Sequence, residues 1–298
     1  MDQHELTRRG FIGTTLGAAA MGAFSPLASS RSTAAAEAVS GKPRLSICIE
    51  ALFTKVPFVQ RIEEVKKVGA TALEFWSWRG KDLDAIARKK DELGLDVAGF
   101  SCDTGGALVA AGSKDKFVPA LKESIATAKK LAAKRMIVTV GQEIKGVERA
   151  EQHKSIVEAL KAGAPVAEEA GITLCLEPLN VLVNHKGYYL ATSAEGFTII
   201  DEVGSPNVLL LFDIYHQQIT EGNLTRNICS NIDKIGHFHV ANNPGRHEPA
   251  IGEINYHYLF TQIRKAGYKH YLGLEFTPSD PARTDEILKG VQQTAAAC

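Results

Sequence analysis

The sequence has few cysteines, few tryptophans and no excess charge of either sign. Five cysteines in 298 residues are too sparse for a disulfide scaffold, and their odd number leaves at least one unpaired within the chain. No two of them have the Cys-x-x-Cys spacing, which argues against a thiolate zinc site or a thioredoxin-like redox site. The 34 basic and 34 acidic side chains cancel, so no overall attraction draws the chain to nucleic acid or to an anionic membrane.

Long apolar runs are also absent. The best candidate, residues 10–24, is shorter than the roughly 20 residues that a membrane-spanning helix needs. Arg8 and Arg9 precede this run, and small residues ending at position 38 follow it, which is the order of a twin-arginine signal peptide. We therefore predict a signal over residues 1–38, export to the periplasm or another extracytoplasmic compartment, and no stable membrane anchor after signal removal. A short buried helix behind a basic tail is the alternative, but the run has no amphipathic period.

From residue 42 onward, short apolar or β-branched runs alternate with longer segments of helical period. The runs predict strands over residues 45–50, 72–76, 97–102, 136–140, 173–177, 208–213, 236–240 and 271–276. Helical period covers residues 58–68, 83–93, 117–133, 156–170, 194–203 and 256–266, and a glycine closes most of these segments. Eight strand–helix units in about 250 residues predict an α/β fold, a single-domain (β/α)₈ TIM barrel over residues 42–298. The rival open, doubly wound sheet is disfavoured because no Gly-x-Gly-x-x-Gly follows the first strand.

Polar side chains end four consecutive predicted strands, at the rim that carries the active site of a barrel. They are Glu177, Asp213, His239 and Glu275. Three carboxylates and an imidazole at one height would repel and lose hydration unless a cation lay among them. Oxygen and nitrogen ligands without thiolate suit Mn²⁺, Mg²⁺ or Co²⁺ better than zinc. His237 lies two residues before His239 and therefore points to the same face of the strand, so it is an alternative to His239 as the metal ligand.

Each of these residues also has a simpler explanation when it is taken alone. Glu177 or Glu275 could form a salt bridge at a strand end, and Asp213 could cap the turn that follows it. A lone histidine such as His239 is more often part of a core than a metal ligand. The predicted metal site therefore depends on the coincidence of four such residues on neighbouring strands.

Several segments resemble the hydroxypyruvate isomerases, within the xylose isomerase-like TIM barrel superfamily. The resemblance runs from about residue 44 to residue 290, in blocks at residues 176–180, 212–217, 236–241, 244–249, 252–256 and 274–276. Its most specific part extends from His239 through Arg-His-Glu-Pro at 246–249 to Gly-Glu-Ile-Asn-Tyr at 252–256. The resemblance implies a metal-dependent isomerisation of the aldose–ketose type, between hydroxypyruvate and tartronate semialdehyde.

The resemblance also implies roles for the strand-end residues. In that family, residues matching Glu177, Asp213, His239 and Glu275 bind the divalent cation, although some members have glutamine in place of His239. Residues matching Glu177 and Glu275 also form the proton donor and acceptor pair. This agrees with the chemistry, since moving a carbonyl to the adjacent carbon requires removal of a proton beside it, through an enediol.

Four further residues are candidates for binding substrate. Residues matching His216 and Arg246 contact substrate oxygens in related sugar epimerases, and Arg246 would hold the carboxylate of an acidic substrate if its loop reaches the pocket. Side-chain alternation puts Glu74 and Trp76 on one face of the second strand, so Trp76 could wall the substrate cavity. Aromatic packing beneath a loop explains Trp76 equally well.

Other functions remain open from the sequence. Within the superfamily, a 2-oxo-tetronate isomerase or a ketose 3-epimerase is the main alternative, and export favours a substrate other than hydroxypyruvate, which is usually cytosolic. A non-catalytic sugar-binding barrel is a third. Related endonucleases at abasic DNA sites use three metals and extra histidines, but the third and fourth strand ends here, residues 101–103 and 140–142, have none. We expect a small hydroxy-keto acid or sugar as ligand and no nucleic acid. The sequence does not decide whether the chain forms a homo-oligomer.

Overall fold

The computed structural model describes residues 41–298, and the signal predicted over residues 1–38 lies outside this part. Within it, eight parallel strands pair in chain order, and the barrel closes because β1 pairs with both β2 and β8. They are β1 (Arg44–Cys48), β2 (Ala72–Ser77), β3 (Asp96–Ser101), β4 (Arg135–Val138), β5 (Thr173–Leu176), β6 (Val208–Asp213), β7 (Ile235–Val240) and β8 (Tyr271–Leu274). Each strand begins and ends within two residues of its predicted bounds, so the predicted TIM barrel is confirmed.

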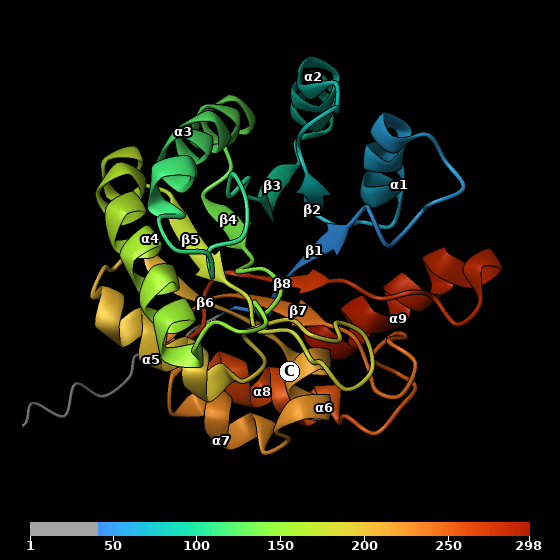
Figure 1. Cartoon of the computed structure of the whole chain (residues 1–298). Helices are drawn as coiled ribbons and strands as arrows, with labels where there is room; N and C mark the ends of the chain where they lie inside the picture. The colour runs from blue at the N-terminus through green and yellow to red at the C-terminus, as the bar shows by residue number, and fades with distance from the viewer. Residues whose placement is uncertain (1–40) are drawn as a thin grey trace, which may run out of the picture. The chain divides into compact units, whose positions relative to one another are not determined.

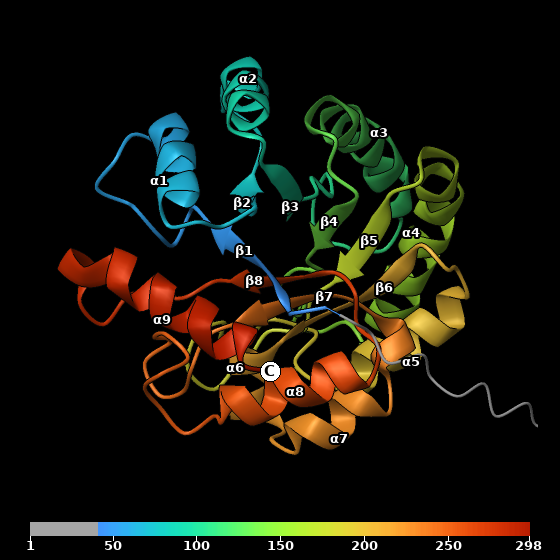
Figure 2. The same cartoon turned by 180° about the vertical axis from the view of Figure 1, so that it is seen from behind.

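Helices surround the ring of strands (Figure 1), as the reverse view also shows (Figure 2). Six of them correspond to predicted segments: α1 (Arg61–Lys67), α2 (Leu83–Leu93), α3 (Lys114–Leu131), α4 (Arg149–Ala170), α5 (Ser193–Val203) and α8 (Tyr256–Lys265). Three lie outside the predicted segments: α6 (Ile214–Thr220), α7 (Leu224–Cys229) and α9 (Thr284–Ala296). No helix in residues 41–298 is both long and apolar enough to pass through a bilayer.

Local signals define the helix ends. The Asp82 carboxylate accepts a hydrogen bond from the backbone N–H of Ala85 and so caps α2, which ends at Gly94 with φ 63°. In the same way, Thr192 caps α5, which ends at Gly204 with φ 70°. Glycine adopts this left-handed conformation without the steric cost of a side chain, which is why the predicted closing glycines mark where these helices stop.

The strands are buried on both faces, as expected for a parallel sheet covered by helices. On the outer face, the ring of Phe75 stacks on Phe100 of the neighbouring strand with centroids 5.5 Å apart. Inside the barrel, Ile137, Cys175 and Leu211 form a small cluster separate from the main core. Cys175 is fully buried, and all five cysteines are unpaired.

Candidate active site

The four residues predicted to bind a cation meet at the carboxyl end of the barrel. One ligand atom from each of Glu177, Asp213, His239 and Glu275 lies within 4.8 Å of all the others. All four residues are buried. The His239 Nδ1 atom lies 3.1 Å from Glu177 Oε1, 3.3 Å from Glu275 Oε2 and 3.9 Å from Asp213 Oδ2. The carboxylates of three strands therefore gather around one imidazole nitrogen.

The strand register decides which histidine lies at this height. Pairing between β6 and β7 puts His239 opposite Asp213 and His237 opposite Leu211, two residues deeper in the barrel. A register shift in β6 between Leu210 and Leu211 sets this alignment. Of the two histidines that the sequence left as alternatives, the structure brings His239 to the carboxylates.

The environments of the two glutamates differ. Burial raises the pKa of the Glu177 carboxyl above its ordinary value, and the neighbouring carboxylates act in the same direction. Burial acts on Glu275 as well, but the positive charges of His239 and Arg246 outweigh it and hold its pKa below the ordinary value. In the absence of a metal ion, Glu177 therefore favours the protonated form more than Glu275 does.

Two donors hold Glu275 in place. The Trp76 Nε1–H donates to Glu275 Oε1 at 2.6 Å, and the Arg246 guanidinium donates to Oε2. Arg246 Nη2 also lies 3.4 Å from Asp213 Oδ2. The backbone of Arg246 has φ 56°, a left-handed conformation that is uncommon for residues other than glycine. The loop that carries Arg246 thus reaches the cluster, which the sequence had left open.

Asp213 uses both of its carboxylate oxygens. Oδ1 accepts a hydrogen bond from the backbone N–H of His216 at 3.0 Å and caps α6, while Oδ2 faces the cluster. The capping role and the place among the candidate ligands are therefore compatible. The His216 ring is fully buried, and Asn180 Nδ2 donates to its Nδ1 at 2.6 Å, which assigns the proton of the neutral ring to Nε2. Burial lowers the pKa of His216 to about 4, so the ring is neutral at pH 7.

The Nε2 atom of His216 has no hydrogen-bond partner in the described part of the chain, and it lies 3.5 Å from Asp213 Oδ2. A buried N–H that lacks a partner is costly unless a ligand or a water molecule accepts from it. His216 therefore presents a donor at the edge of the cluster, as a substrate-binding residue would.

Glu74 and Trp76 lie at different depths. Trp76 is 44% exposed and contacts Glu275, whereas Glu74 is 1% exposed and lies on the inner side of His239. The Glu74 carboxylate contacts Ser46 and His237 inside the barrel. The structure thus brings Trp76 to the cluster and places Glu74 behind the imidazole, without contact to the other three candidate ligands.

Sequence reasoning missed three residues around the site: Ser46, Asn180 and His185. Asn180 lies in one of the blocks that carry the family resemblance, so its position was available as a signal. The His185 ring belongs to the long loop between β5 and α5, and its centroid lies 5.0 Å from that of the His216 ring. We find no sequence pattern that would have identified His185 or Ser46.

The donor set fits a divalent cation. Three carboxylates and one imidazole offer oxygen and nitrogen atoms close together in a buried place, as Mn²⁺, Mg²⁺ and Co²⁺ require. Arg246 alone among the neighbouring side chains in the described residues carries a permanent positive charge against these carboxylates. A bound dication would balance the excess negative charge, and Glu177, Asp213, His239 and Glu275 would hold it.

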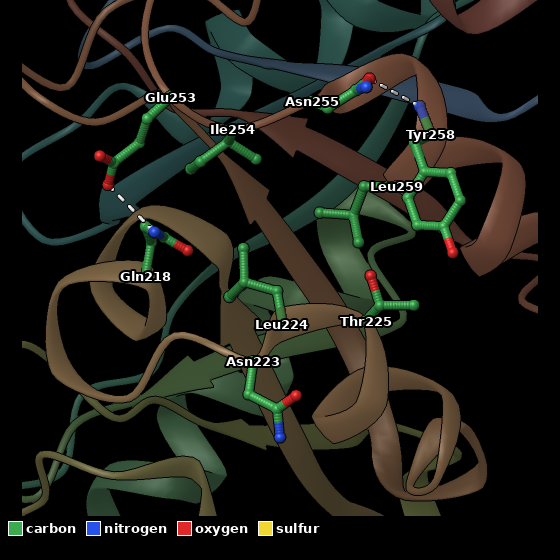
Figure 3. Close-up of a pocket in the computed structure, with 9 residues that line it drawn as sticks. All are labelled: Gln218, Asn223, Leu224, Thr225, Glu253, Ile254, Asn255, Tyr258 and Leu259. Carbon is green, nitrogen blue, oxygen red and sulfur yellow. Dashed lines mark hydrogen bonds between the residues drawn. The ribbon is translucent and has the colours of Figure 1, made fainter.

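A separate hollow lies outside the barrel, between α6, α7 and the segment that leads into α8 (Figure 3). Its volume is about 270 Å³. Two hydrogen bonds engage its polar side chains: Gln218 donates to Glu253 at 3.0 Å, and Asn255 caps α8 by accepting from the backbone N–H of Tyr258 (Figure 3). None of the candidate metal ligands lines this hollow, so we do not include it in the site.

Comparison with known proteins identifies the family. A family model described as xylose isomerase-like TIM barrel matches residues 62–295. The hydroxypyruvate isomerase of Escherichia coli (strain K12) is 31% identical over 242 residues, which cover 79% of this chain and 93% of that protein. The chain belongs to the hydroxypyruvate isomerase family. This membership confirms the predicted family and places the chain in the isomerase class of enzymes.

Two other relatives show the breadth of the family. The 2-oxo-tetronate isomerase of Cupriavidus necator is 29% identical over 243 residues, which cover 79% of this chain and 93% of that protein. A solved structure from Brucella melitensis, described as AP endonuclease, family 2, is 29% identical with a TM-score of 0.78, covering 83% of this chain and 96% of that one. Relatives of similar identity thus carry different activity names.

Proposed function

We propose that this protein is a divalent-metal-dependent isomerase that interconverts hydroxypyruvate and tartronate semialdehyde, or a similar small hydroxy-keto acid or sugar. The observation that carries the proposal is the buried meeting of Glu177, Asp213, His239 and Glu275 at the barrel mouth, beside Arg246. A cation held by these four side chains would polarise two adjacent substrate oxygens and lower the cost of the negative charge that develops on them.

Glu177 and Glu275 move the proton. The ionised Glu275, held by Trp76 and Arg246, takes a proton from the carbon beside the substrate carbonyl, and the C–H electron pair becomes the double bond of an enediol. Glu177, whose pKa burial raises, supplies a proton to the neighbouring carbon and so completes the shift of the carbonyl. One carbon-bound proton leaves the substrate and one returns, while the hydroxyl proton passes from one substrate oxygen to the other, so the substrate protons balance. Proton exchange with water then restores the starting protonation of the two glutamates.

Arg246 favours an acidic substrate. Its guanidinium lies among carboxylates at the rim and offers planar, charge-assisted hydrogen bonds that match a substrate carboxylate. His216 Nε2–H is available to donate to a hydroxyl or carbonyl oxygen of the same molecule. These two donors support a hydroxy-keto acid over a neutral ketohexose. Because the curated 2-oxo-tetronate isomerase is nearly as similar as the hydroxypyruvate isomerase, a four-carbon acid is our second candidate.

The metal-binding groups favour an isomerase over a nuclease. In residues 41–298, the two groups of side chains that could hold an ion share His239, so they do not form separate sites for three metals. The segments that end β3 and β4, residues 101–103 and 140–142, contain no histidine. We therefore do not extend to this chain the activity in the Brucella melitensis description.

Deuterium exchange tests the proposal. The protein, loaded in turn with Mn²⁺, Mg²⁺, Co²⁺ and Zn²⁺, is incubated in D₂O with hydroxypyruvate, a 2-oxo-tetronate and a free ketohexose, and exchange beside the carbonyl is followed by NMR. Glu275→Gln, which removes the proposed base, should lower the exchange rate by about 10²–10⁴-fold. Glu50→Gln is the matched control, because Glu50 pairs with Lys81 and does not touch the cluster.

The outcomes separate the alternatives. Exchange and turnover of hydroxypyruvate that Glu275→Gln abolishes and Glu50→Gln leaves intact support the proposal. Turnover of a free ketohexose without turnover of either acid would identify a ketose 3-epimerase instead. If the parent binds these compounds but exchanges no deuterium with any of the four metals, the protein is a sugar-binding barrel and the isomerase proposal fails.

We also propose that the chain is exported by the twin-arginine route. Arg8 and Arg9 before the short apolar run at residues 10–24 support this, and these residues lie outside the described part of the chain. A reporter fused after residue 42 should appear in the periplasmic fraction, and Arg8→Lys with Arg9→Lys should keep it in the cytoplasm. A reporter that stays cytoplasmic with both arginines intact would overturn the export proposal without affecting the isomerase one.

A further inference from the structure

A second polar cluster lies on the inner side of the candidate metal site and shares one residue, His239, with it. Glu74 of β2 directs its carboxylate into the barrel interior. Its Oε2 accepts a hydrogen bond from Ser46 Oγ at 2.7 Å and lies 2.9 Å from His237 Nε2, while Oε1 lies 3.2 Å from His239 Nε2. All four residues are at most 2% exposed, so bulk water does not reach this carboxylate.

The two nitrogens of His239 have different surroundings. Nδ1 faces the three carboxylates of the candidate metal site, and Nε2 faces Glu74 Oε1. The contact between His239 Nε2 and Glu74 Oε1 is not well aligned, and neither atom has another hydrogen-bond partner in residues 41–298. An imidazole that binds a cation is neutral, with one N–H and one lone pair. If Nδ1 offers its lone pair to a cation held by the four candidate ligands, the N–H is on Nε2 and faces Glu74.

The barrel leaves room for this contact at one position. Gly273 of β8 lies opposite His239 in the register, and a Cβ atom at this position would collide with both carboxylate oxygens of Glu74. The glycine therefore permits Glu74 to occupy the space beside the imidazole. Ser46 of β1 and Glu74 of β2 thus help to place His239 of β7, although neither strand is adjacent to β7.

We propose that Glu74 is a positioning residue that acts through His239. Its carboxylate faces Nε2 from inside the barrel at 3.2 Å, and so favours the ring orientation in which the Nδ1 lone pair points toward the cation site. The inference rests on the proposed function, because it concerns the ion that the four candidate ligands would share. It goes beyond the prediction from sequence, in which Glu74 touches the substrate.

Metal binding measured by calorimetry tests the inference without any substrate. We compare Mn²⁺ affinity in the parent, in Glu74→Gln and in Ser46→Ala, with circular dichroism and thermal melting to verify folding. Loss of a carboxylate that orients a ligating histidine lowers metal affinity by about 10–100-fold, and we expect this for Glu74→Gln. Ser46→Ala is the matched control, because it removes one hydrogen bond from the same carboxylate and leaves the contact with His239; we expect less than a threefold change.

The stoichiometry distinguishes a second possibility. Glu74, His237 and His239 are themselves spaced so that they could hold an ion. One Mn²⁺ per chain in the parent supports the positioning role, whereas two per chain, falling to one in Glu74→Gln, would make Glu74 a ligand and overturn it. An affinity in Glu74→Gln within threefold of the parent, or a loss equal to that of Ser46→Ala, would overturn it as well.

A spectroscopic readout in the unmutated protein keeps the test valid if Glu74→Gln does not fold. In the Zn²⁺-loaded protein with ¹⁵N-labelled histidine, the ring nitrogen signals of His239, assigned with His239→Gln, should show a proton on Nε2 and a metal-bound Nδ1. The opposite tautomer would overturn the inference alone and leave the proposed function standing. A parent that binds neither Mn²⁺ nor Zn²⁺ would overturn both.

Discussion

Replacing Trp76 by phenylalanine removes one hydrogen bond from the site and preserves most of the ring. The bond joins Trp76 Nε1–H to Glu275 Oε1 at 2.6 Å, and it helps to hold the carboxylate that we propose as the base. A hydrogen bond to a charged group contributes about 1.5–3 kcal/mol. Because the indole is 44% exposed, water can reach the vacated position and act as donor, so we take the lower end of this range. At about 1.4 kcal/mol for each factor of ten, kcat/KM should fall about tenfold.

Trp78→Phe is the matched control for this prediction. Trp78 is the other of the two tryptophans, and its Nε1–H donates to Ser124 Oγ at 3.2 Å, away from the candidate metal site. The assay is steady-state kinetics with saturating Mn²⁺ on whichever acid the exchange experiment identifies. The reasoning is refuted by a Trp76→Phe variant within twofold of the parent, or by a Trp78→Phe variant that loses as much activity.

Three further predictions concern stability and substrate binding. Burial tends to raise the pKa of Glu248, but hydrogen bonds from Ser279 bring it below its ordinary value. The ionised form therefore stabilises the fold at neutral pH. The advantage in Tm of the parent over Glu248→Gln should shrink as pH falls from the ordinary carboxyl pKa of about 4.3 through the lower pKa of the folded state, and a constant advantage would contradict this. Removal of divalent ions by a chelator should lower Tm by about 5–10 °C relative to protein with Mn²⁺ at a hundred times its Kd, because the ion binds only the folded state. Calorimetry with and without Mn²⁺ measures this difference. An unchanged Tm would count against an ion site. Arg246→Met leaves Asp213 and Glu275 without their arginine partner, and breaking a buried pair in this way costs about 3–5 kcal/mol. It should lower the Tm of the metal-free protein and raise KM for an acidic substrate more than for a neutral ketose, and equal changes in the two KM values would argue against carboxylate recognition.

The barrel was predictable because each strand is an apolar run that a polar residue ends. Parallel strands in a closed ring bring their carboxyl ends to one rim, so the meeting of Glu177, Asp213 and Glu275 followed from the order of runs alone. The short helices α6 and α7 were not predictable in this way, because six or seven residues are too few to establish a helical period. Helix α9 did leave a signal, since its buried residues Leu288, Val291 and Ala295 have helical spacing.

Depth along the barrel axis was not predictable from the sequence. Alternation shows which face of a strand a side chain occupies, but it does not show how strands are staggered against one another. The choice between His237 and His239 depended on the register shift in β6, and the pairing of β2 with β3 is shifted next to Glu74. For this reason the sequence grouped Glu74 with Trp76, although the structure separates them along the axis.

The contact between Glu74 and Gly273 restricts which substitutions the barrel can accept together. A Cβ atom at position 273 would push the Glu74 carboxylate away from its place beside His239, whereas a small residue at position 74 would leave room for that Cβ. The two positions lie on different strands, 199 residues apart in the chain. An alignment of relatives should therefore show the two positions changing as a pair.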